Sequence, residues 1–177
     1  MTIIKAMDHN QLKNFIRDVP DFPKAGIVFR DISPLLKGHF PETITALASL
    51  LNDEAWDRVQ VIAGIEARGF VLAAGLAAIK EKGFVKIRKP GKLPGPVCTA
   101  SYSLEYGQDS LEMQYGSGEL LIVDDVLATG GTLTAAANLA TECGYHISGF
   151  LCLINLTYLN SFVWSNIQPQ CLITYED

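Results

Sequence analysis

One stretch decides the fold of this chain: Glu119-Leu120-Leu121-Ile122-Val123-Asp124-Asp125-Val126-Leu127-Ala128-Thr129-Gly130-Gly131-Thr132-Leu133. Its four apolar residues, 120–123, are typical of a strand buried on both faces of a parallel sheet. Two carboxylates follow, then a turn of small residues, 128–132, and then a helical pattern over 133–143. Because ligands bind outside the carboxyl ends of strands in open α/β sheets, this order predicts a binding site at the turn.

The turn has the chemistry of a phosphate-binding loop. Its two glycines allow positive φ and a close approach to a ligand, and the backbone N–H groups can point into one anion-binding concavity at a helix N-terminus. The loop has no lysine, and the chain has no GxGxxG, so neither a triphosphatase loop nor a dinucleotide fingerprint is present. The carboxylates of Asp124 and Asp125 suit ribose hydroxyls or a magnesium ion. Together they predict a ribose 5-phosphate site, with an ordinary capped strand–turn–helix as the alternative.

The whole chain has the composition of one ordinary globular domain. It has 177 residues, 49% hydrophobic and 19% charged, which is enough to bury a core. The net charge of −5 argues against nucleic acid or a membrane surface as a partner. The four cysteines form no CxxC pair and the three histidines show no ligand spacing, so no zinc site is expected. The N-terminus lacks a signal-peptide pattern, and we expect a cytoplasmic protein.

Strands alternate with helices along the chain, which predicts an α/β fold with a mainly parallel, doubly wound sheet and helices on both faces. We expect strands over residues 59–65, 84–87, 147–156 and 171–175, and helices near residues 8–16, 41–52 and 70–82. Hairpin arms at 102–106 and 111–115, with a long irregular loop at 21–36, are expected to form a small cover, or hood, over the carboxyl edge of the sheet. Residues 1–177 are interpreted as a single domain, with residues 1–36 contributing to the hood.

Two segments supply cations near that edge. Arg68 follows a predicted strand and can hold an oxyanion with its guanidinium fork, although an exposed loop arginine is the ordinary alternative. The cationic loop, residues 86–96, contains Lys86, Arg88, Lys89 and Lys92. A local polyanion such as pyrophosphate suits this loop, and a solvated charge run is its plainer interpretation.

Two further segments are ambiguous from the residues alone. Glu105 and Tyr106 are either a cross-strand pair in the hairpin or a catalytic carboxylate beside an aromatic ring. Phe29 is either a core residue or a ring that stacks on a heterocycle.

Several of these segments together resemble the adenine phosphoribosyltransferase family, within the type I phosphoribosyltransferases. They are Phe29-Arg30-Asp31-Ile32-Ser33-Pro34, Glu66-Ala67-Arg68-Gly69-Phe70, Ser103-Leu104-Glu105-Tyr106-Gly107 and the stretch quoted first. The resemblance implies a type I phosphoribosyltransferase-like fold and the reaction of adenine with phosphoribosyl pyrophosphate (PRPP) to give AMP and pyrophosphate, in purine salvage. It also implies Mg²⁺ as cofactor, carried by PRPP or pyrophosphate without an assured protein ligand, and a homodimer.

The resemblance assigns roles to individual residues. Asp124 and Asp125 are expected to bind the ribose. The 5-phosphate is expected at Ala128, Thr129, Gly130, Gly131 and Thr132. Pyrophosphate is expected at Arg68 and Lys89, with Arg88 and Lys92 as weaker candidates. Adenine is expected at Val28, Phe29 and Arg30. Glu105, on a flexible loop with Tyr106, is expected to handle the proton of the purine.

The resemblance fails in one segment, and two other functions stay open. Where the family usually has Glu-Leu and later Gly-Arg, this chain has Asn155-Leu156-Thr157-Tyr158-Leu159-Asn160-Ser161-Phe162. The alternatives are a phosphoribosyltransferase for another purine base and a PRPP-binding regulator without turnover. A base-competition assay separates the first from the main hypothesis, and the absence of room for a partner-binding module argues against the second.

Overall fold

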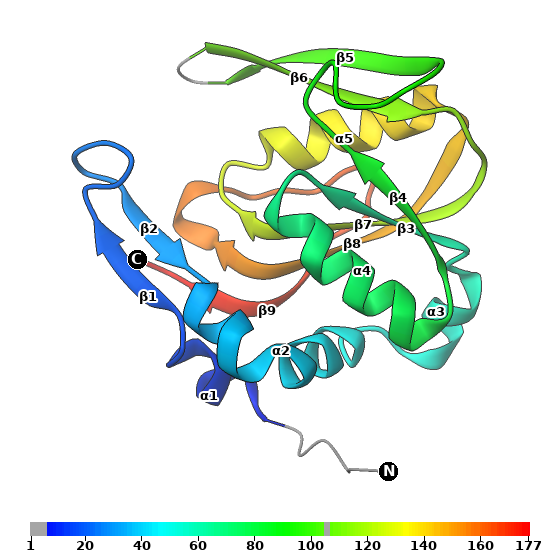
Figure 1. Cartoon of the computed structure of the whole chain (residues 1–177). Coiled ribbons are helices and arrows are strands. Elements are labelled where there is room, and N and C mark those ends of the chain that lie inside the picture. The colour runs from blue at the N-terminus through cyan, green and yellow to red at the C-terminus, as the bar shows by residue number, and fades with distance from the viewer. Residues whose placement is uncertain (1–6, 105–106) are drawn as a thin grey trace. The chain divides into compact units, whose positions relative to one another are not determined.

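The computed structural model describes residues 7–104 and 107–177, and the side chains of residues 101–109 are outside that description. Glu105 and Tyr106 therefore lie outside the described residues. The chain divides into two compact units, Met1–Ser49 and Leu50–Asp177 (Figure 1). Among the described residues, no helix is both long and apolar enough to cross a membrane.

The first unit contains two helices and a two-stranded antiparallel sheet. Helix α1 (His9–Lys13) begins at a capping box, in which the Asp8 side chain accepts from the Gln11 backbone N–H. Strands β1 (Arg17–Pro20) and β2 (Val28–Asp31) pair with each other. Helix α2 (Ser33–Ala48) follows, with a non-helical residue at His39.

Two predictions for this unit are wrong in extent. The segment 21–36 is not irregular throughout, because it contains β2 and the first turn of α2. Helix α2 begins eight residues before the predicted start at 41, because an additional helical segment, from Ser33 to the kink at His39, precedes the predicted one. The Asp31 Oδ1 atom accepts from the Ser33 backbone N–H at 2.9 Å, which supports this early start, and a proline at the first helical positions suits it.

The second unit is built on a five-stranded parallel sheet in the order β4-β3-β7-β8-β9. Its strands are β3 (Val61–Ile65), β4 (Gly83–Ile87), β7 (Gly118–Leu127), β8 (Tyr145–Leu156) and β9 (Gln170–Tyr175). Helix α4 (Arg68–Lys80) connects β3 to β4, and α5 (Gly131–Glu142) connects β7 to β8. Because these connections run in opposite directions across the sheet, right-handed crossovers place the two helices on opposite faces (Figure 1). The predicted doubly wound α/β fold is confirmed.

The hairpin and the short helices complete this unit. Strands β5 (Val97–Leu104) and β6 (Gly107–Gln114) form an antiparallel pair that packs on α5. Leu111 and Met113 of β6 share one buried cluster with Ala136 of α5 and the sheet. Helix α3 (Asp53–Arg58) was not predicted; the Asn52 side chain caps it by accepting from the Ala55 N–H at 2.9 Å. A 3₁₀ turn (Thr157–Leu159) follows β8.

Candidate active site

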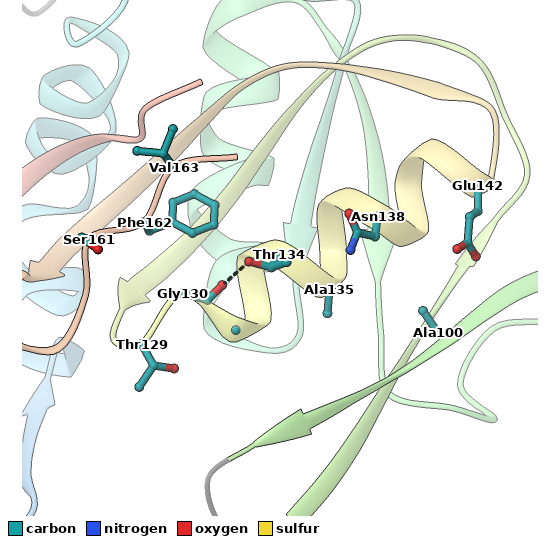
Figure 2. A pocket seen from close by; sticks show the side chains of 11 residues that line it. Ala100, Thr129, Gly130, Thr134, Ala135, Asn138, Glu142, Ser161, Phe162 and Val163 are labelled. Atoms are coloured by element: carbon teal, nitrogen blue, oxygen red, sulfur yellow. Dashed lines mark hydrogen bonds between the residues drawn. The ribbon is translucent and has the colours of Figure 1, made fainter. Parts of the chain in front are cut away.

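The phosphate loop, residues 128–132, joins the end of β7 to the first turn of α5. Gly130 has φ +86°, a conformation that side chains with a Cβ rarely adopt. A Cβ at this position would also lie 2.8 Å from the Phe162 ring. The Thr134 hydroxyl donates to the Gly130 carbonyl at 2.9 Å, as Figure 2 shows. The backbone therefore needs glycine here both for its conformation and for the ring packed against it.

Two buried carboxyls stand just before this loop, on β7. Asp124 and Asp125 are 8% and 6% exposed, and the Asp125 backbone N–H donates to Asp124 Oδ1 at 2.9 Å. Burial, together with the charge of Asp125, raises the pKa of Asp124 well above its ordinary range. Burial also raises the pKa of Asp125, and the nearby Arg68 guanidinium opposes that rise. The pair holds a proton more readily than isolated aspartates do.

Arg68 is brought to this pair by the start of α4. Its Nε atom lies 2.7 Å from Asp125 Oδ2. The next residue, Gly69, is fully packed, because a Cβ there would lie 2.8 Å from the Val123 carbonyl oxygen and 3.0 Å from Asp124 Oδ1. The glycine thus lets the first turn of α4 approach the end of β7 closely enough for the ion pair.

One cavity brings together five of the residues that the sequence analysis proposed for the site. It has a volume of about 230 Å³ and is lined by Ile65, Glu66, Ala67, Arg68, Lys89, Leu111, Asp124, Asp125 and Thr132. Cations, carboxyls and the last residue of the phosphate loop therefore border the same space. Arg88 and Lys92 do not line it.

A larger cavity of about 560 Å³ lies along α5 and is also bordered by the phosphate loop (Figure 2). Thr129, Gly130 and Gly131 contribute to its wall, as do Asn138 of α5 and Phe162. The Asn138 Oδ1 atom also accepts from the Trp164 indole N–H at 3.0 Å. The phosphate loop is thus accessible from two cavities.

The cationic loop is held by two carboxylates that the sequence did not single out for that task. Glu66 binds the Arg88 guanidinium through both oxygens, at 2.9 and 3.2 Å, and accepts from the Lys89 backbone N–H at 2.9 Å. These hydrogen bonds lower the pKa of Glu66. Arg88 also donates to the Lys92 carbonyl at 3.2 Å. In this structure the guanidinium of Arg88 therefore braces the loop rather than lining the cavity.

Glu112 of β6 is the second of these carboxylates and is only 3% exposed. It accepts from the backbone N–H groups of Gly91, Lys92 and Leu93 at 2.6–2.8 Å. Burial opposes ionisation of Glu112, but the three N–H donors outweigh it and lower the pKa of the carboxyl. The alternation of β6 alone gives no sign of this role, because Glu112 sits between two buried apolar residues, Leu111 and Met113.

The candidate adenine residues belong to the first unit, on β2. Phe29 packs edge-on against Phe22, with ring centroids 5.2 Å apart. The Arg30 guanidinium forms an ion pair with Asp18 at 2.5 Å, and its side chain is 10% exposed. Val28 is exposed. These three residues remain predictions as adenine ligands.

Two carboxyls and a glycine-rich loop at the end of a central parallel strand, facing an arginine and a lysine, define a phosphoribosyltransferase of type I. The family model of the phosphoribosyl transferase domain matches residues 37–156. Relatives from Hydrogenovibrio crunogenus and Bdellovibrio bacteriovorus, both named adenine phosphoribosyltransferase, are 47% and 49% identical; the alignments cover 97% and 93% of this chain and 100% and 99% of the relatives. The chain belongs to the adenine phosphoribosyltransferase family.

Solved structures agree with that assignment. The crystal structure of adenine phosphoribosyltransferase from Thermoanaerobacter pseudethanolicus superposes with a TM-score of 0.84 at 40% identity, covering 94% of this chain and 99% of the other. The Saccharomyces cerevisiae enzyme, crystallised with an imino-altritol bisphosphate and adenine, gives 0.82 at 32% identity, covering 93% and 97%.

Proposed function

We propose that this chain transfers the phosphoribosyl group of PRPP to adenine, releasing pyrophosphate and forming AMP. Family membership supports the reaction. The observation that carries it at the level of residues is the 230 Å³ cavity, where Arg68, Lys89, Asp124, Asp125 and Thr132 meet. This set has cations for a leaving group, carboxyls for a diol and a phosphate loop, in one space.

The leaving group needs positive charge. Breaking the bond between C1 of the ribose and pyrophosphate places negative charge on the departing oxygens, and fixed cations offset that charge. Arg68 and Lys89 border the cavity and are proposed to bind pyrophosphate directly. Arg88, paired with Glu66, and Lys92, outside the cavity lining, are proposed as lesser contributors.

The rest of PRPP is proposed to lie along β7 and the phosphate loop. The carboxyls of Asp124 and Asp125 accept hydrogen bonds from the ribose hydroxyls. The N–H groups of Ala128, Thr129, Gly130, Gly131 and Thr132 receive the 5-phosphate, aided by the N-terminus of α5. A Mg²⁺ ion carried by PRPP fits here, because buried carboxylate oxygens border the cavity and hard oxygen ligands suit it. When bound, the ion neutralises charge on the pyrophosphate.

The base and its proton are assigned by resemblance. Val28, Phe29 and Arg30 are proposed to bind adenine, with Phe29 stacking on the ring. A backbone acceptor and donor at this strand suit the N6 amine and N1 of adenine and oppose a 6-oxopurine. Glu105 is proposed to take the N9 proton as the nitrogen attacks, with Tyr106 on the same loop.

The wider setting is also a proposal. We infer one catalytic domain over residues 1–177, with residues 1–36 contributing to a hood, and a cytoplasmic homodimer without nucleic acid or membrane partners. The net charge of −5 supports the last point. Sedimentation velocity at micromolar concentration tests the dimer, and a monomer at that concentration contradicts it.

The function is tested by offering adenine, hypoxanthine, guanine or xanthine separately with PRPP and Mg²⁺. We expect AMP from adenine alone, and its loss in Glu105→Ala. Turnover of an oxopurine instead contradicts the role of residues 28–30 and leaves the PRPP site standing. PRPP binding without product from any base favours the regulator.

A further inference from the structure

The side chain of Asn160 connects three parts of the second unit. Its Nδ2 atom donates to the carbonyl oxygens of Ala128 at 2.7 Å and Leu156 at 2.9 Å, and to Asn155 Oδ1 at 3.1 Å. Its Oδ1 atom accepts from the Phe162 backbone N–H at 3.1 Å. The amide group has two hydrogens for three acceptors, so every polar atom of this side chain is used.

The first of these contacts bears directly on the phosphate loop. Ala128 is the first residue of the loop, and its carbonyl oxygen lies in the same rigid peptide plane as the N–H group of Thr129. The two groups point in opposite directions. A hydrogen bond that fixes the Ala128 carbonyl therefore also fixes the direction of the Thr129 N–H, in a residue that lines the larger cavity.

The hydrogen bond to Asn155 fixes the position of the Asn160 side chain. Asn155 lies near the end of β8, paired in register with Leu127 at the end of β7. Its Oδ1 atom accepts one hydrogen of Asn160 and orients the amide. Asn160 is thus anchored to the end of β8, a strand of the central sheet.

Phe162 also lies beside the phosphate loop. Its ring packs on Gly130 and meets the buried Phe150 ring edge-on, with centroids 5.2 Å apart. Figure 2 shows this ring beside the loop. The Asn160 Oδ1 atom accepts from the Phe162 backbone N–H, so the amide that contacts Ala128 and the ring that contacts Gly130 are linked to each other.

We propose that Asn160, oriented by Asn155, is a positioning residue that sets the phosphate loop for the 5-phosphate of the substrate. This inference rests on the proposed function for the identity of that phosphate. It assigns a task to the segment 155–162, where the resemblance to the family fails. Because the support is made by neutral amides, it adds no negative charge beside the bound phosphate.

The test compares two ends of the substrate. Asn160→Asp has nearly the same shape but places an oxygen against the carbonyls of Ala128 and Leu156. We expect KM for PRPP to rise about 10-fold, as the loss of a partly buried hydrogen bond implies, with kcat and KM for adenine within about threefold. By calorimetry, ribose 5-phosphate should bind more weakly by a similar factor and inorganic pyrophosphate equally well.

The control is Asn166→Asp, which adds the same charge at an exposed residue four positions beyond Phe162 and should leave both affinities unchanged. Equal weakening of ribose 5-phosphate and pyrophosphate in Asn160→Asp, or no weakening of either, overturns the proposal. If Asn160→Asp does not fold, the same two ligands are measured with Asn155→Ala. We then expect the affinity for ribose 5-phosphate to fall about threefold and the affinity for pyrophosphate to stay unchanged. Ligand binding needs no turnover, so a failure of the proposed reaction is seen separately in the AMP assay.

Discussion

The phosphate loop and the cationic loop both reach the 230 Å³ cavity, through Thr132 and Lys89, but groups of opposite character support them. Neutral groups hold the phosphate loop: the amide of Asn160 and the ring of Phe162. Two carboxylates, Glu66 and Glu112, hold the cationic loop through its backbone N–H groups. Each loop is thus supported by groups that match the charge of the loop itself: carboxylates for the cationic loop and neutral groups for the loop without a cation.

The difference has an electrostatic reason. The cationic loop brings together several positive charges that repel each other in the absence of substrate, and carboxylates offset that repulsion. The phosphate loop binds its ligand with backbone dipoles and carries no cation, so a nearby carboxylate would only weaken phosphate binding. We therefore expect the support of the cationic loop to depend on pH and the support of the phosphate loop to be insensitive to it.

The largest expected effect is at Glu112. In Glu112→Leu three backbone donors lose their acceptor, and the loop that carries Lys89 loses its fixed course. We expect kcat/KM for PRPP to fall about 100-fold, as displacement of a binding group by about an ångström implies. Steady-state kinetics measures this. The control is Glu112→Gln, which keeps one acceptor oxygen and should lose less activity.

A smaller effect separates two lysines of the same loop. Lys89 lines the cavity and Lys92 does not, although both are exposed. We expect Lys89→Gln to raise KM for PRPP about 30-fold, through loss of a charge-assisted hydrogen bond. Lys92→Gln should change it less than threefold. Equal effects from the two variants, measured in the same assay, would show that the loop acts as a diffuse charge.

A substitution at Gly130 tests the support of the phosphate loop by the Phe162 ring. In Gly130→Ala the methyl group meets the Phe162 ring and the backbone must hold φ +86°, a strain of about 1–3 kcal/mol. We expect KM for PRPP to rise about tenfold, equally at pH 6 and pH 8. The matched change Gly38→Ala, where a Cβ meets nothing within 4 Å, should leave KM unchanged.

The smallest effect concerns a carboxylate far from either loop in sequence. Hydrogen bonds from Ser33, assisted by Arg17, lower the pKa of Asp31 to about 2. Because the pKa in the folded protein lies below the ordinary value of 3.8 for an aspartate, this carboxylate stabilises the fold above about pH 4, and the contribution is lost as the pH falls towards 2. Asp31→Asn should lower the Tm by a few degrees at pH 6 and by less at pH 2.5. An equal loss at both pH values contradicts the assignment.

The sequence predicted the parts of this molecule that depend on local pattern. The apolar run of β7, the small residues 128–132 and the alternation of strands and helices all lie within short windows, and the sheet and the phosphate loop follow from them. The supports of the loops could not be predicted in this way. Glu112 is 21 residues from Gly91 and Asn160 is 32 residues from Ala128, so each contact depends on the folded sheet. Helix α3 was not predicted because its six residues are too few to show a clear helical periodicity.

The hydrogen bond between Trp164 and Asn138 provides an optical reporter. The chain has two tryptophans, and the other, Trp56, is only 3% exposed and lies beneath the Lys80 ammonium group. In a Trp56→Phe variant the remaining tryptophan emission would come from Trp164 alone. Trp164 lies two residues after Phe162, and its ring packs on Phe150. The wavelength and intensity of this emission would follow the segment beside the phosphate loop in real time, without an added dye.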